Sequence, residues 1–241
     1  MVEAYLNPIE KLTRIEVDRS QSKGLDWYSP EEVDRVWDQM REKNPRYFNG
    51  PILAFQRYEP DTGVITAQVE QYKLHAVYNS DHSKAHIDLG VRLFAVTACI
   101  QRSDPDHLRF LIGRRSSNSH CYGGLWEFGP SGGVQPPKNH DSMSPLELVM
   151  SLMKEVREET GINLDPNYIT PRSIVFDGNV NSEDVHFDVI LTDDQPIRTN
   201  WEYDDTRWVT LDELIAWCDE KPDEIIPTTI AHARFLHEAR A

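Results

Sequence analysis

The spacing of apolar residues predicts a helix near the start of the chain. Ser29-Pro30-Glu31-Glu32 is typical of a helix N-terminus, with Ser29 as the N-cap, proline at the first helical position and Glu32 completing a capping box. Apolar residues then follow at i, i+3, i+4 and i+7, namely Val33, Val36, Trp37 and Met40. The pattern stops near Asn44-Pro45, where we expect the helix to end.

Alternation of apolar and polar residues replaces this pattern after the helix. It predicts three strands, over residues 52–58, 64–71 and 72–77, with Asp61-Thr62-Gly63 as the turn between the first two. From about residue 89 the apolar residues become denser. We therefore predict a smaller, strand-rich α+β unit over residues 1–88 and a second domain over residues 89–241.

Strand and helix patterns alternate in the second domain. Strands are predicted over 91–100, 108–112, 125–128, 172–177, 185–191 and 207–209, and helices over 144–160, 211–219 and 227–239. A Gly/Pro-rich stretch, 129–143, precedes the first of these helices. The fold class indicated is mixed α/β.

The balance of charge narrows the classes of partner. Among 241 residues, 25 are Lys or Arg and 40 are Asp or Glu, which gives a formal net charge of −15. A protein that binds nucleic acid through its surface needs a basic stripe, and the sequence has none, so we expect no nucleic-acid partner. An anionic ligand stays compatible with this acidity, because carboxylates can hold divalent cations that in turn bind phosphates.

Location is predicted from the apolar runs and the cysteines. The longest apolar-leaning run, Leu93 to Ile100, is far shorter than the roughly 20 residues of a membrane span, and the first residues lack the basic start and apolar core of a signal peptide. Cys99, Cys121 and Cys218 form no C-x-x-C pair, so neither a disulfide framework nor a zinc knuckle is indicated, and reduced, mostly buried thiols are expected. These features predict a cytoplasmic protein without a membrane partner.

Three glutamates gather on the helix predicted over 144–160. Its expected buried stripe consists of Leu146, Val149, Leu152, Met153 and Val156. At 100° per residue, Glu155, Glu158 and Glu159 share an arc of about 100° on the face away from that stripe. Such carboxylates repel one another, and a divalent cation held by oxygen ligands, Mg²⁺ or Mn²⁺, would relieve the repulsion. Taken alone, a glutamate run of this kind is more often a solvated helix face.

The string around these glutamates resembles the core of the Nudix box, G-x5-E-x7-R-E-U-x-E-E-x-G-U, where U is a bulky aliphatic residue. Residues 154–162, KEVREETGI, meet every specified position of the second half except the first, where Lys154 replaces arginine. The segments 110–115, 124–128, 132–133 and 208–214 are similar to the strands and turns around the box in Nudix hydrolases. The resemblance implies a Nudix α/β/α sandwich with a mixed sheet.

Three departures from the family pattern stand out. The loop between Gly133 and Lys154 is about seven residues longer than in the pattern, and the upstream glutamate is missing, since position 146 is leucine and Glu147 is explained by a capping box. Lys154 offers a point charge where an arginine would hold a carboxylate bidentately, so the orientation of Glu155 is expected to be looser.

The resemblance also assigns candidate roles. It implies metal ligation by Glu155, Glu158, Glu159 and the main-chain carbonyl of Gly132, with Lys154 beside them. Arg115 stands where relatives bind phosphate, although a solvent-exposed edge-strand arginine explains it equally. The general base varies across the family; Glu159 and Glu202 are both candidates, and Glu202 also fits a solvated acidic loop.

The segments 49–51, 72–79, 89–91 and 130–133 are similar to the nucleotide-sugar diphosphatase subgroup, which cleaves UDP-glucose and UDP-galactose. This similarity makes Tyr72 and Asn79 candidate substrate contacts. The predicted function is Mg²⁺- or Mn²⁺-dependent hydrolysis of a nucleoside diphosphate derivative, a UDP-sugar, to a nucleoside monophosphate and a sugar 1-phosphate. A homodimer is one possible assembly.

Three alternatives remain open at this point. The same chemistry could act on ADP-ribose, NADH, CoA or dinucleoside polyphosphates. The domain could instead be a non-catalytic, nucleotide-binding regulator with a Nudix fold, or an isomerase that acts on a diphosphate without cleaving it.

Overall fold

The computed structural model describes residues 4–20, 29–80, 90–105, 107–119 and 121–240. Its first helix, α1 (Pro30–Lys43), begins as predicted, with the Ser29 side chain accepting a hydrogen bond from the Glu32 main-chain N–H. The four apolar residues of the predicted face are buried. β3 (Pro51–Glu59) and β4 (Val64–Gln71) then form the predicted antiparallel hairpin.

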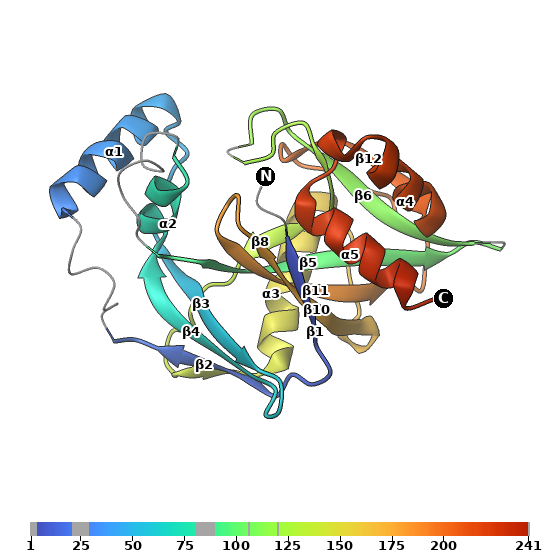
Figure 1. Cartoon of the computed structure of the whole chain (residues 1–241), viewed down its shortest axis with the longest axis horizontal. Coiled ribbons are helices and arrows are strands. Elements are labelled where there is room, and N and C mark those ends of the chain that lie inside the picture. The colour runs from blue at the N-terminus through green and yellow to red at the C-terminus, as the bar shows by residue number, and fades with distance from the viewer. Residues whose placement is uncertain (1–3, 21–28, 81–89, 106, 120, 241) are drawn as a thin grey trace.

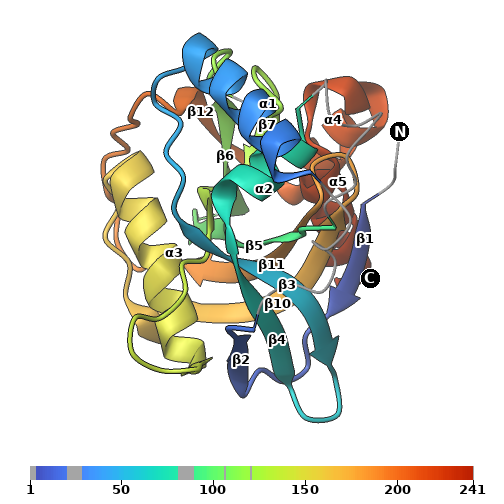
Figure 2. The ribbon, with the colours of Figure 1, turned by 90° about the vertical axis from the view of Figure 1, so that its left-hand side faces the viewer.

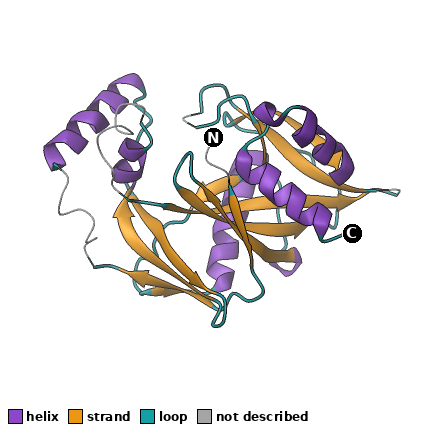
Figure 3. Cartoon of the chain, viewed as in Figure 1, coloured by secondary structure: helices purple, strands orange, loops and turns teal. Residues whose placement is uncertain are grey.

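The third predicted strand is wrong, because residues Tyr72–Tyr78 form a short helix, α2. Leu74, Val77 and Tyr78 lie at i, i+3 and i+4, so this short run satisfies a helical period as well as an alternating one. Leu74 and Val77 contribute to a small core that α2 shares with Val36 and Trp37 of α1. Figure 3 shows this pair of helices apart from the other three, above the ends of the hairpin strands.

The prediction omits two strands near the N-terminus. β1 (Tyr5–Pro8) adds to β10 (Ile169–Asp177), and β2 (Arg14–Asp18) lies between β4 and β9 (Ser142–Met143). Both strands depend on partners more than 45 residues away in the sequence. β1 shows no clear alternation, whereas β2 alternates polar and apolar residues over a run of only five residues.

The second part of the chain follows the predicted order of elements. Its remaining strands are β5 (Leu93–Ser103), β6 (Leu108–Arg115), β7 (Trp126–Phe128), β8 (Ser131–Gly133), β11 (Ser182–Ile190) and β12 (Tyr203–Thr210). Its helices are α3 (Pro145–Thr160), α4 (Leu211–Glu220) and α5 (Pro227–Glu238). Within the described residues the strands form one twelve-stranded sheet, in which β11 and β5 are parallel and most other neighbours antiparallel.

The helices cover both faces of this sheet. In Figure 2, α3 lies on one side of β5, β10 and β11, and α4 and α5 lie on the other. Figure 1 shows the same arrangement from the direction in which α5 crosses in front of the sheet. The predicted α/β/α sandwich with a mixed sheet is therefore confirmed. None of the helices in the described segments is both long and apolar enough to span a membrane.

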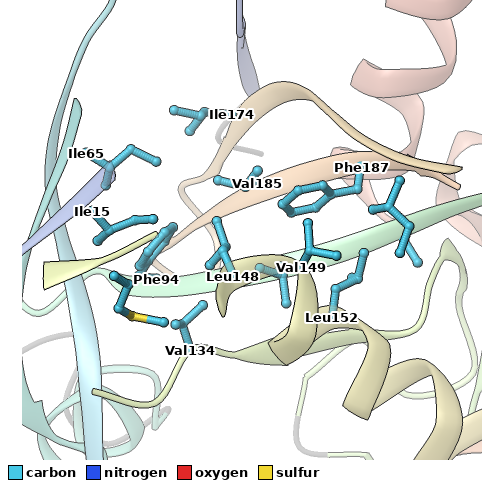
Figure 4. Packing of buried hydrophobic residues seen from close by; sticks show 14 of the residues in the cluster. Ile15, Ile65, Phe94, Val134, Leu148, Val149, Leu152, Ile174, Val185 and Phe187 are labelled. Atoms are coloured by element: carbon cyan, nitrogen blue, oxygen red, sulfur yellow. The ribbon is translucent and has the colours of Figure 1, made fainter. Parts of the chain in front are cut away.

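The largest hydrophobic core lies between α3 and the sheet and draws on both parts of the chain. Ile15 and Ile65, from β2 and β4, pack into the same cluster as Phe94 of β5 and Leu148 of α3 (Figure 4). β3 also pairs with β5, at Ala54 and Leu93. The predicted units 1–88 and 89–241 thus share one core, and the proposed boundary falls in 81–89, outside the described residues.

The buried stripe of α3 differs from the predicted one at its start. Leu146 is 56% exposed, whereas Leu148 is fully buried with Val149, Leu152 and Val156. The first turn is oriented by its caps, because Ser144 and Glu147 form a complete capping box. At the other end the helix closes on Gly161, in the left-handed region at φ 72°.

Candidate active site

The last turns of α3 bring glutamates against the short strand β8. The side chain of Glu155 packs directly on Gly132, where a Cβ atom would lie 2.5 Å from Glu155 Cγ and 2.6 Å from Cδ. Only a residue without a side chain leaves room for this carboxylate beside the main chain. The structure therefore places Glu155 and Gly132, two predicted metal ligands, side by side.

Glu159 lies deeper than predicted. Its position seven residues after Leu152 turns it to the buried face, and only 4% of its surface is exposed, so the prediction that all three glutamates face away from the core is wrong for this residue. Burial raises the pKa of Glu159 to about 10, and repulsion from Glu202, Glu127 and Glu155 adds to this effect. Four carboxylates thus converge here.

Glu158 points to solvent and meets Lys154. Lys154 Nζ lies 3.0 Å from Glu158 Oε2 and 3.2 Å from Glu155 Oε1, and the side chains of Lys154 and Glu158 are each 56% exposed. The lysine therefore spans two of the three glutamates from outside the helix. An ammonium group can do this as a point charge, and exposed pairs of this kind contribute about 0–1 kcal/mol each.

Glu202 reaches the cluster on the segment before β12. The main-chain N–H groups of Arg198 and Asn200 donate to the carbonyls of Thr160 and Glu159, which fixes this segment on the C-terminal turn of α3. Glu202 follows, half-buried, and burial raises its pKa, with repulsion from Glu155 and Glu127 acting the same way. Glu202 is therefore not a fully solvated loop residue.

Arg115 is held by a buried glutamate that sequence reasoning did not assign to the site. Arg115 Nη1 donates to Glu127 Oε1 at 2.8 Å, and Tyr203 Oη donates to the same oxygen at 2.8 Å. Glu127 is 2% exposed. Proximity to Glu127 raises the pKa of Arg115 further above its ordinary value. The arginine is thus no freely solvated edge residue.

The sequence does carry a signal for Glu127 and Tyr203. Glu127 stands between two aromatic residues of a short, fully buried strand, where an acidic side chain needs a specific partner. Tyr203 reaches it because Gly113 and Gly129 leave space, since a Cβ at either glycine would overlap the tyrosine side chain. These two glycines and the isolated glutamate mark a buried polar cluster.

A hollow of about 930 Å³ opens beside these carboxylates. Its lining includes Arg115 and Glu202 together with the aromatic residues Tyr72, Phe48 and Trp201. Burial raises the pKa of Tyr72 to about 12, so its hydroxyl stays protonated. Lys43 and Arg46 add positive charge to the lining.

Asn79, the other predicted substrate contact, lies in a neighbouring hollow that adjoins this one through Lys43, Asn44 and Tyr47. Its side-chain amide donates to the carbonyl of Val180 at 2.6 Å and contacts His75 Nε2 at 3.0 Å. The structure therefore brings Tyr72, and not Asn79, to the hollow beside the glutamates.

A small cavity of about 220 Å³ adjoins the hollow at Arg115, and its lining includes the acidic residues Glu127, Asp177 and Asp184. The Tyr122 hydroxyl donates to the Asp177 carboxylate, with Oδ2 at 2.7 Å and Oδ1 at 2.9 Å. Thr97 Oγ1 donates to Asp184 Oδ2 at 3.0 Å. Sequence reasoning did not single out these aspartates. Strand alternation places Asp184 and the core residue Val185 on opposite faces, which could have indicated it.

The donor set suits a hard divalent cation. Glu155 packs on the main chain at Gly132 and lies close enough to Glu159 for their carboxylates to repel each other, and magnesium and manganese prefer oxygen ligands of this kind. The Gly132 cradle holds the Glu155 carboxylate at the strand, and Arg115 supplies a cation for an anionic ligand nearby. This arrangement can bind a metal–phosphate group.

Comparison with known families decides the identity of the domain. The model of the NUDIX domain matches residues 92–229, more than half of the chain. The chain belongs to the Nudix family. The prediction of a Nudix hydrolase, an enzyme that acts on phosphoric anhydrides, is thereby confirmed, and the UDP-sugar subgroup is not distinguished.

Solved structures similar to this Nudix hydrolase include a MutT protein from Methanosarcina mazei Go1, with 24% identity, coverage of 62% of this chain and 96% of that chain, and a TM-score of 0.47. The NUDIX domain of Shewanella oneidensis NrtR, complexed with ADP ribose, has 18% identity, coverage of 68% and 94%, and a TM-score of 0.46. A C. elegans Ap4A hydrolase has 14% identity, coverage of 62% and 99%, and a TM-score of 0.42. No curated protein matches the chain. At identities and TM-scores this low, no substrate follows from the likeness.

Proposed function

We propose that this Nudix hydrolase is a Mg²⁺- or Mn²⁺-dependent diphosphatase of nucleoside diphosphate derivatives, with a UDP-sugar as substrate. The products would be a nucleoside monophosphate and a sugar 1-phosphate. The observation that carries the proposal is the packing of the Glu155 side chain on Gly132, with buried Glu159 close enough to feel both Glu155 and Arg115 electrostatically. Carboxylate ligands for a cation thus lie near Arg115, a cation for phosphate that lines the hollow.

Glu155, Glu158, Glu159 and the Gly132 carbonyl would hold the metal. Bound there, a divalent cation neutralises phosphate oxygens and lowers the pKa of an attacking water. Lys154 keeps Glu155 and Glu158 oriented by its two ion pairs. Glu202 is the general base in this proposal, because its side chain lines the hollow whereas that of Glu159 is buried.

The hollow also supports a nucleoside. Phe48 and Trp201 are 80% and 57% exposed and line it together with Tyr72, so flat apolar surfaces for stacking on a base lie beside the acidic cluster. Lys43, Arg46 and Arg115 supply charge for the diphosphate. The choice of a UDP-sugar rests on the sequence resemblance of residues 49–51 and 130–133. Asn79 would act indirectly, by fixing the main chain at Val180 beside the adjoining hollow.

The test is a substrate panel with Mg²⁺ or Mn²⁺, containing UDP-glucose, UDP-galactose, ADP-ribose, NADH, CoA and dinucleoside polyphosphates. We expect nucleoside monophosphate from the UDP-sugars, and none after chelation of the metal. Glu158→Gln should lose at least about 100-fold in turnover, or about 2.7 kcal/mol. Glu220→Gln, an exposed glutamate of α4 outside the site, is the matched control and should keep the wild-type rate.

Each outcome of the panel decides one part of the proposal. Release of monophosphate from another panel member alone would overturn the UDP-sugar assignment and keep the chemistry. No monophosphate from any member would overturn the hydrolase, and would favour the nucleotide-binding regulator. The homodimer and the cytoplasmic location stay predictions from the sequence.

A further inference from the structure

A second group of ligand-type side chains lies on the face of the sheet that α4 and α5 cover. Ligand atoms of Cys99, Asp188 and His232 all lie within 4.8 Å of one another. Asp188 of β11 stands directly across from Cys99 of β5 in the parallel register, and His232 comes from α5. Cys99 and His232 are fully buried. Thus three elements far apart in sequence place a thiol, a carboxylate and an imidazole together.

Hydrogen bonding leaves one side of this group unsatisfied. Ser173 Oγ is hydrogen-bonded to His232 Nδ1 at 2.9 Å, and in the described parts of the chain His232 Nε2 has no partner. Asp188 shows the same division, because Oδ2 lies 3.1 Å from Arg172 Nε whereas Oδ1 has no hydrogen bond to any described residue. His232 and Asp188 therefore each keep one atom available for a ligand, and among the described residues Cys99 Sγ accepts only a long contact of 4.0 Å from Gln101 Nε2.

A second buried imidazole adjoins the group. The rings of His186 and His232 have centroids 4.6 Å apart, and His186 is fully buried. Neither of its ring nitrogens is hydrogen-bonded to a described residue. Buried polar atoms in folded proteins almost always have a partner, so several orphaned nitrogens and oxygens at one place indicate a bound ion or water.

The chemistry of the donors selects the ion. A thiol and an imidazole are soft and borderline ligands, which suit zinc and are not used by magnesium. We propose that Cys99, Asp188 and His232 bind a zinc ion at a structural site separate from the glutamates of α3. The Ser173 hydroxyl orients His232 through its other nitrogen, as partners of metal-bound histidines do. Thiolate and carboxylate together balance the charge of Zn²⁺.

Such an ion would fix α5 on the sheet behind the active site. The same helix already holds β7, since Thr229 Oγ1 accepts the main-chain N–H of Phe128 at 2.7 Å. β7 carries Glu127, the partner of Arg115. The zinc site would therefore stabilise the scaffold of the cluster without touching substrate.

The experiment adds Co²⁺ or Zn²⁺ to chelator-treated protein in the presence of excess Mg²⁺, which occupies oxygen-only sites. We expect uptake of one equivalent per chain, and a thiolate-to-cobalt charge-transfer absorption that reports a sulfur ligand. Cys99→Ser should abolish this absorption. Cys218→Ser, which replaces a buried thiol in the apolar cluster that also contains Leu211 and Leu214, is the matched control and should retain it.

Two further readouts do not depend on the Cys99→Ser variant. Zinc should raise the melting temperature of the Mg²⁺-saturated wild-type protein, and Ser173→Ala should bind zinc about 10–100-fold more weakly. Absence of zinc uptake by the wild type would overturn the proposal and leave Cys99 and His232 as ordinary core residues. Persistence of the charge-transfer absorption in Cys99→Ser would overturn it as well.

Discussion

The contact between Gly132 and Glu155 allows a sharp test of how the candidate site is built. In Gly132→Ala the new Cβ would lie 2.5 Å from Glu155 Cγ and 2.6 Å from Cδ, about 1 Å inside an ordinary carbon–carbon contact. In Gly133→Ala the nearest atom is Leu93 Cδ1, at 3.3 Å. Neighbouring glycines of one strand thus provide a variant and its matched control.

The side chain of Glu155 should give way before the strand does. β8 is hydrogen-bonded along β5, whereas the Glu155 side chain is 22% exposed and can rotate toward Lys154. We therefore expect a stability loss of about 1 kcal/mol, at the lower end for overpacking. Displacement of a metal ligand by about 1 Å should lower kcat/KM by about 100-fold, which corresponds to about 2.7 kcal/mol.

The assay compares both variants on whichever panel substrate gives the highest rate, over a range of Mg²⁺ concentrations. Gly132→Ala should lose rate and require more Mg²⁺ for half-maximal activity, while Gly133→Ala should stay within about threefold of the wild type. Urea unfolding checks that both variants are folded. Equal activity of the two variants would refute the role of Gly132 and of Glu155 as its neighbour.

Two further predictions concern the buried charges around the site. Arg115→Ala leaves the Glu127 carboxylate buried without its cation, so it should lower the free energy of unfolding at pH 7 by about 3–5 kcal/mol. Adding Glu127→Gln to the same chain should restore most of this loss. A loss below about 1 kcal/mol in urea unfolding would contradict the pairing. Burial raises the pKa of Asp184 from 3.8 to about 7, so the folded state keeps a proton that the unfolded chain releases, and stability is lost as pH rises across this interval. At 1.36 kcal/mol per pH unit, the stability gained by Asp184→Asn should be about 3 kcal/mol larger at pH 8 than at pH 5, and a gain independent of pH would show that Asp184 does not titrate there.

The elements that sequence pattern predicted correctly are those with local signals. The helix α3 has a capping box at Ser144, a long apolar face and a glycine at its end, so its limits follow from residues within the helix itself. The short segment from Tyr72 lacked such signals and was misread as a strand. β1 is formed by pairing with a distant strand and carries no clear local alternation, whereas the alternation of β2 covers only five residues.

The candidate site shows the same division. Glu155, Glu158 and Glu159 could be found because they lie on one helix within five residues. Glu127, by contrast, reaches the cluster through the register of β7 on β6, and its importance follows from the burial of its carboxylate. The burial of Glu159 follows from helical geometry, because it lies seven residues after Leu152 and shares the buried face of that residue.

The central claim is that the glutamates of α3 and the main chain of β8 hold catalytic cations. A crystal grown with Mn²⁺ tests it most directly, through the anomalous scattering of manganese. The account predicts manganese bound by Glu155, Glu159 and the carbonyl oxygen of Gly132, with Glu158 at the exposed edge. Manganese absent from this face in a crystal whose dissolved protein still hydrolyses its substrate would contradict it.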